Sequence, residues 1–380
     1  MYKLTKPLIF IAGVVLGISL AYFNLPLTHQ SSEVSPATEQ EFQPIFETLS
    51  LIQDKYARDY DISELIDSAN KGLVAGLGDD FSYQLNAEEF SQLEASLNST
   101  FSGVGIRLDQ VEGKTFVVTP IKDSPALAAG IKPGDQIVKV DDEDITDQPL
   151  DLIISKITGP VDSYVTLSLI RGEEPLQFEI QRKEIVAPST NLEYKDGVAV
   201  LDIDQFARNT ANEVSSYLAE PELQSSKELI IDLRDNPGGY LDSVVEIADY
   251  FLDSGVIYSQ KGKQSEHSES ADKETMVPTD LQIVVLIDDH SASAAEILAG
   301  ALKDNHRATL IGQKTYGKGS VQELIDVDDD NYLRLTTALW YTPDGVNIDH
   351  EGISPDTTLE SDQDSLEYAL SHLDDWTNLR

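Results

Sequence analysis

The chain has 380 residues, enough for a large hydrophobic core and two folded domains. Its 67 acidic residues outnumber 27 basic residues, and the resulting formal net charge of −40 repels phosphate backbones and argues against nucleic acid as a partner. Because the sequence contains no cysteine, disulfides, thiolate metal sites and cysteine nucleophiles are all excluded.

The first 27 residues predict a membrane anchor. Lys3 and Lys6 precede an apolar run from Pro7 to Phe23, which continues to Leu27 with one polar interruption and has about the length of a spanning helix. No A-x-A-like cleavage site follows it, which favours an uncleaved anchor over a signal peptide. The two lysines predict a cytoplasmic N-terminus. We therefore expect an inner-membrane anchor and a catalytic part that is periplasmic or outside the cell.

Residues 28–41 are rich in Ser, Thr, Pro and Glu and predict a flexible tether. Residues 42–98 predict a helical region, because apolar residues recur at spacings of three and four. These residues are Ile45, Leu49, Ile52, Tyr56, Leu65, Ala69, Leu73 and Leu77. Such stripes favour a homodimer through this region, and packing against the chain's own core is the alternative.

Residues 99–183 predict a small β-rich domain inserted in the chain. The expected strands are Val104–Leu108, Thr115–Thr119, Gln136–Val140, Val165–Ile170 and Leu176–Ile180, with short helices from Ser124-Pro125 and over Gln148–Ile157.

Two segments of this domain, FSGVGIRL and SPALAAGIKPGDQIVKVDD, resemble a PDZ domain. The resemblance implies that Gly103 and Gly105 turn backbone N–H groups toward a peptide's C-terminal carboxylate, while Val104 and Ile106 line an apolar pocket beside it. An ordinary turn is the alternative for Gly-x-Gly alone. Proteins with apolar C-terminal tails are therefore the expected partners.

Residues 184–380 predict an α/β domain with a partly parallel sheet, because strands alternate with helices. The expected elements are strands Val198–Ile203, Leu229–Leu233, Leu281–Ile287 and Ala308–Ile311, and helices Asn209–Leu218, Tyr240–Leu252 and one from Ser293. Burial on both faces explains the nearly unbroken apolar runs LIIDL and IVVLI. The polar stretch from Ser259 to Glu274 predicts a long loop bordering a cleft.

The motif DLRDNPGG, Asp232 to Gly239, ends a predicted buried strand. Two glycines at a strand–helix junction leave backbone N–H groups unshielded, as an oxyanion site requires. A tight turn that needs positive φ is the structural alternative.

The motif SASAAE, Ser291 to Glu296, follows the strand IVVLI. Ser293 would open a helix, where the N-terminal dipole favours a developing negative charge. Ser293 with Glu296 also fits an S-x-x-E capping box, and that purely structural role is the alternative.

The motif TYGKGSVQ, Thr315 to Gln322, places Lys318 between two glycines after a predicted strand. A lysine kept neutral by burial can replace histidine as a general base, and Gln322 could hold its amine in place. The alternative is a solvated surface lysine.

Together these segments resemble the C-terminal processing peptidases, and the likeness runs from about Phe42 to about Asp356, including GLGDDFSYQL and TPDGVNIDHEGISPD. In that family the second serine of SAS is the nucleophile and the lysine of GKG follows 25 residues later, as Lys318 follows Ser293. The resemblance implies Ser293 as nucleophile, Lys318 as general base and Gln322 as its partner. It also implies a ClpP/crotonase-like α/β core, with Gly239 and Ala294 N–H groups as the oxyanion hole. No cofactor or metal is expected.

Several features leave other functions open. Thr158 stands where the family often has an arginine that helps couple the PDZ domain to the active site, which leaves hydrolysis as the expectation but argues against PDZ-driven activation. A membrane-tethered PDZ adaptor with a decayed peptidase domain is the main alternative function. Acyl-CoA chemistry on a related fold is disfavoured by the PDZ domain and the predicted location. His290 precedes Ser293 by only three residues, but we expect its ring to point away.

Overall fold

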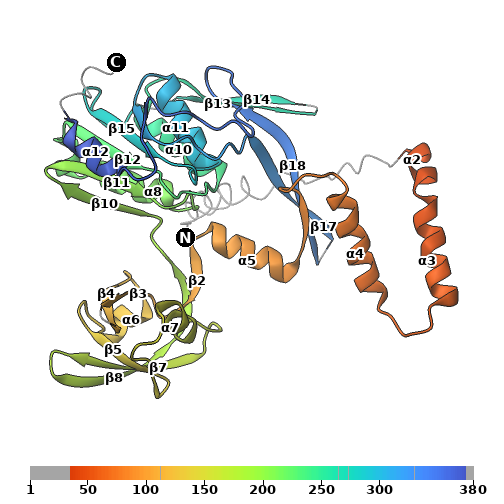
Figure 1. Ribbon diagram of the computed structural model, residues 1–380, viewed down its shortest axis with the longest axis horizontal. Coiled ribbons are helices and arrows are strands. Elements are labelled where there is room, and N and C mark those ends of the chain that lie inside the picture. Colours follow the sequence, from red (N-terminus) through yellow and green to blue (C-terminus); the bar gives the residue numbers. More distant parts are fainter. Residues whose placement is uncertain (1–34, 112, 264, 273, 329, 374–380) are drawn as a thin grey trace, which may run out of the picture. The chain divides into compact units, whose positions relative to one another are not determined.

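The computed structural model describes residues 35–111, 113–263, 265–272, 274–328 and 330–373 (Figure 1). The chain divides into two compact units, residues 1–67 and 68–380. The predicted anchor and the first part of the predicted tether lie outside the described residues. Among the residues that are described, no helix is both long enough and apolar enough to cross a membrane.

The N-terminal region is helical, as the apolar periodicity predicts. Its helices are α2 (Pro36–Glu41), α3 (Gln43–Lys55) and α4 (Ile62–Ala75). Ser35 is the N-cap of helix α2, and its hydroxyl accepts the Thr38 N–H. Pro36 occupies the first helical position. The last residues of the predicted tether are therefore helical rather than extended.

The inserted domain is a small antiparallel sheet with two short helices. Its elements are β3 (Ile106–Val111), β4 (Lys114–Pro120), α6 (Pro125–Ala129), β5 (Gln136–Val140), β6 (Glu143–Asp144), α7 (Leu150–Ile157), β7 (Tyr164–Arg171) and β8 (Glu174–Gln181). The strand order is β3-β4-β5-β7-β8, with β6 paired to β5. A ribbon of β2 (Thr100–Gly103) and β9 (Lys183–Val186) carries the chain into and out of this domain.

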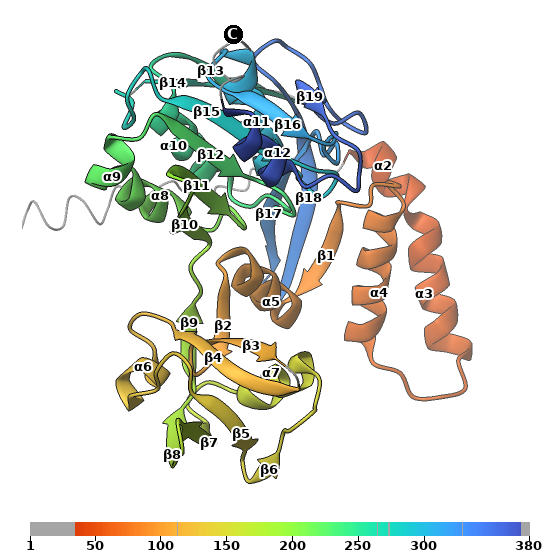
Figure 2. The same ribbon diagram turned by 60° about the vertical axis from the view of Figure 1, so that its left-hand side comes forward.

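The predicted α/β domain contains a mainly parallel sheet with the order β10-β11-β12-β15-β16-β19 (Figures 1 and 2). Its strands are β10 (Thr190–Lys195), β11 (Val198–Ile203), β12 (Glu228–Asp232), β15 (Gln282–Ile287), β16 (Thr309–Gly312) and β19 (Thr357–Thr358). Only the β10–β11 pair is antiparallel among these strands as described.

Helices cover both faces of this sheet. They are α8 (Thr210–Leu218), α9 (Pro221–Gln224), α10 (Leu241–Phe251), α11 (Ala294–Asp304) and α12 (Ser365–Ser371). Along β12, Leu229 and Ile231 pack in one core with α8, α10 and α11, whereas Ile230 packs in a second core with α12. Because successive side chains enter opposite cores, the three central positions of the strand, Leu229 to Ile231, are all apolar, which explains the nearly unbroken run LIIDL.

An antiparallel sheet completes the second unit, in the order β1-β18-β13-β14, with β17 also paired to β18. Its strands are β1 (Tyr83–Asn86), β13 (Gly255–Gly262), β14 (Glu266–Ala271), β17 (Ser320–Asp328) and β18 (Asn331–Tyr341), and helix α5 (Ala87–Leu97) follows β1. The prediction of a long loop over residues 259–274 is wrong, because β13 and β14 form a hairpin there. β14 is mostly exposed and polar, so its sequence lacks the apolar alternation that marks a strand.

Candidate active site

The three sequence motifs follow strands of the main sheet that lie side by side. β12 ends at Asp232, β15 at Ile287 and β16 at Gly312, and β15 pairs in parallel with both of the others. Because the carboxyl ends of adjacent parallel strands meet at one sheet edge, the loops that carry DLRDNPGG, SASAAE and TYGKGSVQ come together there.

These loops enclose a cleft of about 330 Å³. All residues that the sequence proposes for hydrolysis line this cleft, namely Gly239, Ser293, Ala294, Lys318 and Gln322. Side chains from α5, β17 and β18 complete its walls, including Leu93, Leu324, Arg334 and Trp340. The residues proposed for hydrolysis alone come from positions up to 83 apart in the chain, Gly239 to Gln322.

The glycine turn of DLRDNPGG is fixed by Asn236, which is fully buried. Its side chain donates to the Ile203 carbonyl at 2.6 Å and accepts the Gly238 N–H at 2.8 Å. The Gly238 carbonyl accepts the Phe206 N–H at 2.9 Å. Since C=O and N–H of a trans peptide point in opposite directions, the Gly239 N–H points away from Phe206. It has no hydrogen-bond partner among the described residues and is open to an anion.

Both glycines of this turn are required by their surroundings. A Cβ on Gly238 would lie 2.8 Å from the Ser293 Cβ, and a Cβ on Gly239 would lie 2.2 Å from the Phe206 carbonyl oxygen. Both residues also have positive φ, +100° and +147°. The turn can therefore approach the SAS segment closely only without side chains.

Ser293 immediately precedes helix α11 and has φ 56° and ψ −114°. A serine in this region costs about 1–3 kcal/mol, and such strain persists only where the surroundings impose it. The Ala292 N–H donates to the Asn236 carbonyl at 2.9 Å, which ties the serine loop to the glycine turn. The next residue, Ala294, is the first of α11, so its N–H lacks an intrahelical partner. Ser293 therefore lies beside two backbone donors.

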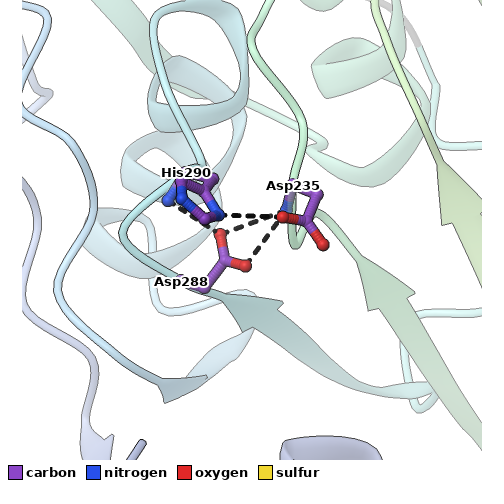
Figure 3. A group of neighbouring side chains, drawn as sticks. All are labelled: Asp235, Asp288 and His290. Atoms are coloured by element: carbon purple, nitrogen blue, oxygen red, sulfur yellow. Dashed lines mark hydrogen bonds and ion pairs between the residues drawn. The ribbon is translucent and has the colours of Figure 1, made fainter.

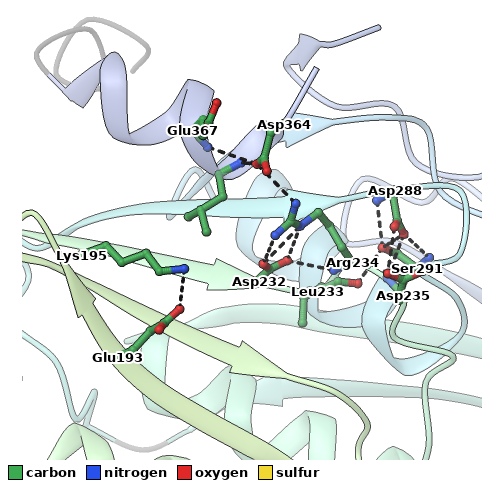
Figure 4. Close-up of polar contacts among 11 residues, drawn as sticks. Glu193, Lys195, Asp232, Leu233, Arg234, Asp235, Asp288, Ser291, Asp364 and Glu367 are labelled. Atoms are coloured by element: carbon green, nitrogen blue, oxygen red, sulfur yellow. Dashed lines mark hydrogen bonds and ion pairs between the residues drawn. The ribbon is translucent and has the colours of Figure 1, made fainter. Parts of the chain in front are cut away.

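Ser291, the other serine of the motif, has a structural role (Figure 4). It is fully buried, and its hydroxyl donates to the Leu233 carbonyl at 2.7 Å. It also lies 3.0 Å from both the Asp288 carboxylate and the Asp288 N–H. A hydroxyl with these partners links the end of β12 to the serine loop, whereas Ser293 and not Ser291 lines the cleft.

Arg234 of DLRDNPGG joins this edge of the sheet to α12 (Figure 4). Its guanidinium forms a two-pronged ion pair with Asp232, with contacts of 2.6 and 2.8 Å, and lies 3.6 Å from Asp364. The planar guanidinium matches the carboxylate in this geometry. Arg234 thus anchors the glycine turn at its start.

The lysine loop passes between strands with almost no room for side chains. A Cβ on Gly317 would lie 2.8 Å from the Gly352 nitrogen, and a Cβ on Gly319 would lie 2.5 Å from the Asp349 nitrogen. The Lys318 carbonyl accepts the Trp340 indole N–H at 2.8 Å. The segment NIDHEG of the C-terminal motif therefore packs directly on the glycines of GKG, which explains why both motifs occur together.

Glu296 connects the serine loop to the lysine loop and was assigned no catalytic part by the sequence. Its fully buried carboxylate accepts the N–H of Ser293 at 2.8 Å. This is the hydrogen bond from the N-cap backbone to the Glu side chain in the predicted capping box. The carboxylate also accepts the Thr315 hydroxyl at 2.6 Å and the N–H groups of Gly317 and Lys318 at 2.8 and 2.9 Å. Burial raises the pKa of Glu296, and these four hydrogen bonds oppose that rise by favouring the carboxylate. The S-x-x-E pattern is thus both a helix cap and the link between the loops that carry Ser293 and Lys318.

The Lys318 amine is suited to accept a proton. The pKa of Lys318 is lowered from 10.5 to about 8, mainly by burial away from water and also by the positive charge of Arg334. The carboxylates of Glu296 and Asp79 oppose this effect. A substantial fraction of the amine is therefore neutral near pH 7 to 8, so the solvated-surface alternative for this lysine is wrong.

Gln322 lines the same cleft, but its amide nitrogen is already engaged. It donates to the hydroxyls of Ser320 and Thr336 at 2.9 and 3.2 Å. In the part of the chain that is described, Gln322 makes no hydrogen bond to the Lys318 amine. Its predicted role as the partner of Lys318 stays a prediction, with the amide oxygen as the atom available for it.

The predicted peptide-binding residues line a separate small pocket of about 40 Å³ in the inserted domain. Its lining comprises Gly103, Val104, Gly105 and Ile106 with Phe101, Leu108, Ile154, Ile157 and Thr158. The Val104 carbonyl accepts the Ala126 N–H at 2.9 Å, so the Gly105 N–H of the same peptide unit points away from α6. The arrangement leaves a backbone donor beside an apolar pocket.

His290 lies in an exposed group with Asp235 and Asp288 (Figure 3). Its Nδ1 is 2.9 Å from the Asp235 carboxylate, whose hydrogen bond raises the pKa of His290. Candidate metal-ligand atoms of these three side chains lie within 4.8 Å of one another. The Asp288 carboxylate is occupied with the N–H groups of Asp235, His290 and Ser291, so its main role is to hold the two loops together.

Comparisons with known proteins agree with this geometry. Residues 197–359 match peptidase family S41, and residues 102–181 match the PDZ domain. A probable CtpA-like serine protease of Staphylococcus epidermidis is 32% identical over 363 residues, which are 94% of this chain and 74% of that protein. The chain belongs to peptidase family S41. A similar Staphylococcus aureus protein is 31% identical over 355 residues, covering 93% of this chain and 71% of its own length.

Solved structures place this S41 peptidase in the same fold. The photosystem II D1 C-terminal processing protease superposes with a TM-score of 0.52 at 26% identity, over 83% of this chain and 87% of that one. An S41 protease from Bacteroides fragilis has the same fold, with a TM-score of 0.50 at 16% identity over 99% and 94% of the two chains. The protein is therefore a serine-type peptidase of the C-terminal processing family that carries a PDZ domain.

Proposed function

We propose that this S41 peptidase cleaves proteins at or near their C-termini, with Ser293 as nucleophile and Lys318 as general base. One observation carries the proposal: a lysine with a pKa of about 8 lines the same cleft as a strained serine and two open backbone N–H groups. A surface lysine or a simple helix cap would need none of these features.

In the proposed reaction the neutral Lys318 amine takes the hydroxyl proton as Ser293 Oγ attacks the scissile carbonyl carbon. The N–H groups of Gly239 and Ala294 stabilise the oxyanion of the tetrahedral intermediate. The Lys318 ammonium then donates its proton to the leaving amine, and an acyl-enzyme remains. Water, deprotonated by the same amine, releases the acyl group and restores Ser293.

The PDZ domain is proposed to select the substrate. A free carboxylate would accept the Gly105 N–H, and the adjoining pocket would take the last side chain of the tail. Because the pocket measures only about 40 Å³ and its side chains are apolar, we expect small apolar terminal residues to bind best.

The proposal includes a ClpP/crotonase-like core, an inner-membrane anchor at residues 1–27 and a periplasmic or external catalytic part. Its support is the parallel sheet with glycine-turn donors at its carboxyl edge, together with the apolar N-terminal sequence. The homodimer through the N-terminal helices also stays a prediction, which sedimentation of the full chain in detergent would test.

A tail-swap experiment tests the proposal. The full chain is incubated with an unstructured reporter protein that ends in either small apolar or acidic residues, and the products are identified by mass spectrometry. We expect tail-dependent cleavage near the C-terminus that Ser293→Ala abolishes. Binding of the apolar tail without any cleavage would favour the adaptor function instead.

A further inference from the structure

The Lys318 amine is covered by an aromatic ring from a distant part of the sequence. Phe81 lies in the turn just before β1, and its ring centroid is 4.8 Å from Lys318 Nζ. Both side chains are half-buried. The motif GLGDDFSYQL thus lies beside Lys318, the proposed general base. Its residue types alone give no chemical reason for that position.

A set of hydrogen bonds fixes the turn that presents this ring. The Asp79 carboxylate accepts the Phe81 N–H at 3.0 Å and the Ser82 hydroxyl at 2.5 Å. The Ser82 oxygen in turn accepts the Thr336 N–H of β18 at 2.9 Å. Ser82 is buried, so these bonds are shielded from water. These hydrogen bonds fix the backbone of the turn and therefore the position of Phe81.

The charged groups around the amine cannot by themselves keep it neutral. Arg334 on β18 favours the neutral amine, whereas Glu296 on α11 and Asp79 in the turn favour the ammonium. Loss of water is the largest influence on this lysine. Apolar side chains near the amine leave less room for water, and the ring of Phe81 faces Nζ with its centroid 4.8 Å away.

We infer that Phe81 is a positioning residue of the peptidase, which keeps the Lys318 amine dry and thereby neutral enough to act as a base. The inference deepens the proposed function and rests on it for its catalytic meaning. An aromatic face also attracts an ammonium ion, and this attraction opposes the effect of excluding water. Exclusion of water can change a lysine pKa by several units, so it prevails here.

The two effects of the ring predict different outcomes for two substitutions. Phe81→Ala admits water and should raise the Lys318 pKa by about one unit. Phe81→Leu keeps an apolar cover but removes the aromatic face, and should leave the pKa close to that of the unchanged protein. Phe90→Ala is the matched control, because Phe90 stacks on Tyr332 of β18 with ring centroids 3.9 Å apart and is not among the residues that line the cleft with Lys318.

The test measures Lys318 directly in the full chain with Ser293→Ala, so that it does not depend on activity. The rate at which an amine-acylating reagent labels Lys318 is followed against pH by mass spectrometry of the Lys318 peptide. We expect the midpoint to move upward only with Phe81→Ala. Should that variant lose its fold, Phe81→Gln keeps most of the volume while bringing polar atoms to the amine, and the same rise is expected.

An unchanged or lower midpoint in Phe81→Ala, or an equal rise in Phe90→Ala, would overturn the inference. So would a rise in Phe81→Leu equal to that in Phe81→Ala, because Phe81→Leu keeps the apolar cover. With Ser293 restored, Phe81→Ala should cleave about tenfold more slowly at pH 7 and recover at high pH. A moved midpoint without this loss would instead reject Lys318 as the base, and hence the proposed function.

Discussion

Two glycine turns, one in the PDZ domain and one in the peptidase domain, use the same backbone arrangement. In each, a carbonyl is bonded to a neighbouring segment, Val104 to Ala126 and Gly238 to Phe206. The N–H of the following glycine then points the opposite way, toward a pocket. The first donor is suited to a carboxylate that exists before binding, and the second to an oxyanion that exists only during reaction.

The surroundings of the two turns differ, and this difference separates recognition from catalysis. The PDZ turn borders a small apolar pocket with no ionisable side chain in its lining. The peptidase turn borders a cleft with a serine in a strained conformation and a lysine of lowered pKa. A free N–H group is therefore only part of a site, and the side chains beside it decide what it does.

The largest expected effect comes from removing Ser293, the proposed nucleophile, because it should affect the peptidase turn and not the PDZ turn. Ser293→Ala should lower hydrolysis by about 10⁴-fold or more while tail binding to the PDZ turn stays unchanged. The control is Ser291→Ala, which leaves the Asp288 N–H without its acceptor and should cost about 1–3 kcal/mol of stability but retain activity. Peptide hydrolysis and thermal unfolding would be measured for both variants, and we expect Ser293→Ala to lose activity and Ser291→Ala to lose stability. Loss of activity in Ser291→Ala alone would reverse the assignment.

Lys318→Arg should have the next largest effect. Arginine keeps the positive charge but stays protonated, so hydrolysis should fall by about 10²–10⁴-fold at every pH. Steady-state kinetics from pH 6 to 10 provide the measurement. An arginine variant that remains active would show that the lysine acts through charge alone.

Matched glycine substitutions compare the two turns directly. Gly239→Ala places a Cβ 2.2 Å from a carbonyl oxygen, so the turn must move, and hydrolysis should fall by about 10²–10³-fold. Gly105→Ala places a Cβ 2.4 Å from the Ser124 Cβ and should weaken tail binding, while a short peptide that bypasses the PDZ domain is cleaved normally. Parallel binding and cleavage assays separate the two. An equal loss of tail binding and hydrolysis in both variants would contradict separate roles for the two turns.

The smallest expected effect tests whether the PDZ turn recognises a C-terminal carboxylate. Amidating the C-terminus of a peptide removes the charge that the Gly105 N–H would bind, and binding should weaken by about tenfold. Isothermal titration of the free-acid and amidated peptides to the Ser293→Ala protein gives both affinities. Identical affinities would mean that the turn does not recognise a carboxylate.

Much of the fold could be predicted from the sequence where one segment determines its own structure. The run LIIDL predicted a strand buried on both sides, and the cap at Ser124-Pro125 predicted helix α6. The strands β14 and β17 were missed, because most of their positions are exposed and their sequences lack the apolar alternation that marks a strand.

The candidate site shows the same limit. The motifs indicated Ser293, Lys318 and the glycines, because their chemistry can be read from residue type and spacing. The four hydrogen bonds to Glu296 and the ring of Phe81 over Lys318 depend on contacts between loops, which spacing does not reveal. Residues that hold a catalytic group in place therefore become visible only in the folded chain.

One measurement tests the central claim most directly, namely that a neutral Lys318 activates Ser293. The pH dependence of kcat/KM for a short peptide would be compared with the labelling midpoint of Lys318 in the Ser293→Ala protein. Because the pKa of Lys318 is lowered to about 8, activity should rise with pH and level off above that value, and both midpoints should coincide. A rate profile with its midpoint near 6.5, the value of an ordinary histidine, and a separate Lys318 midpoint would contradict the account.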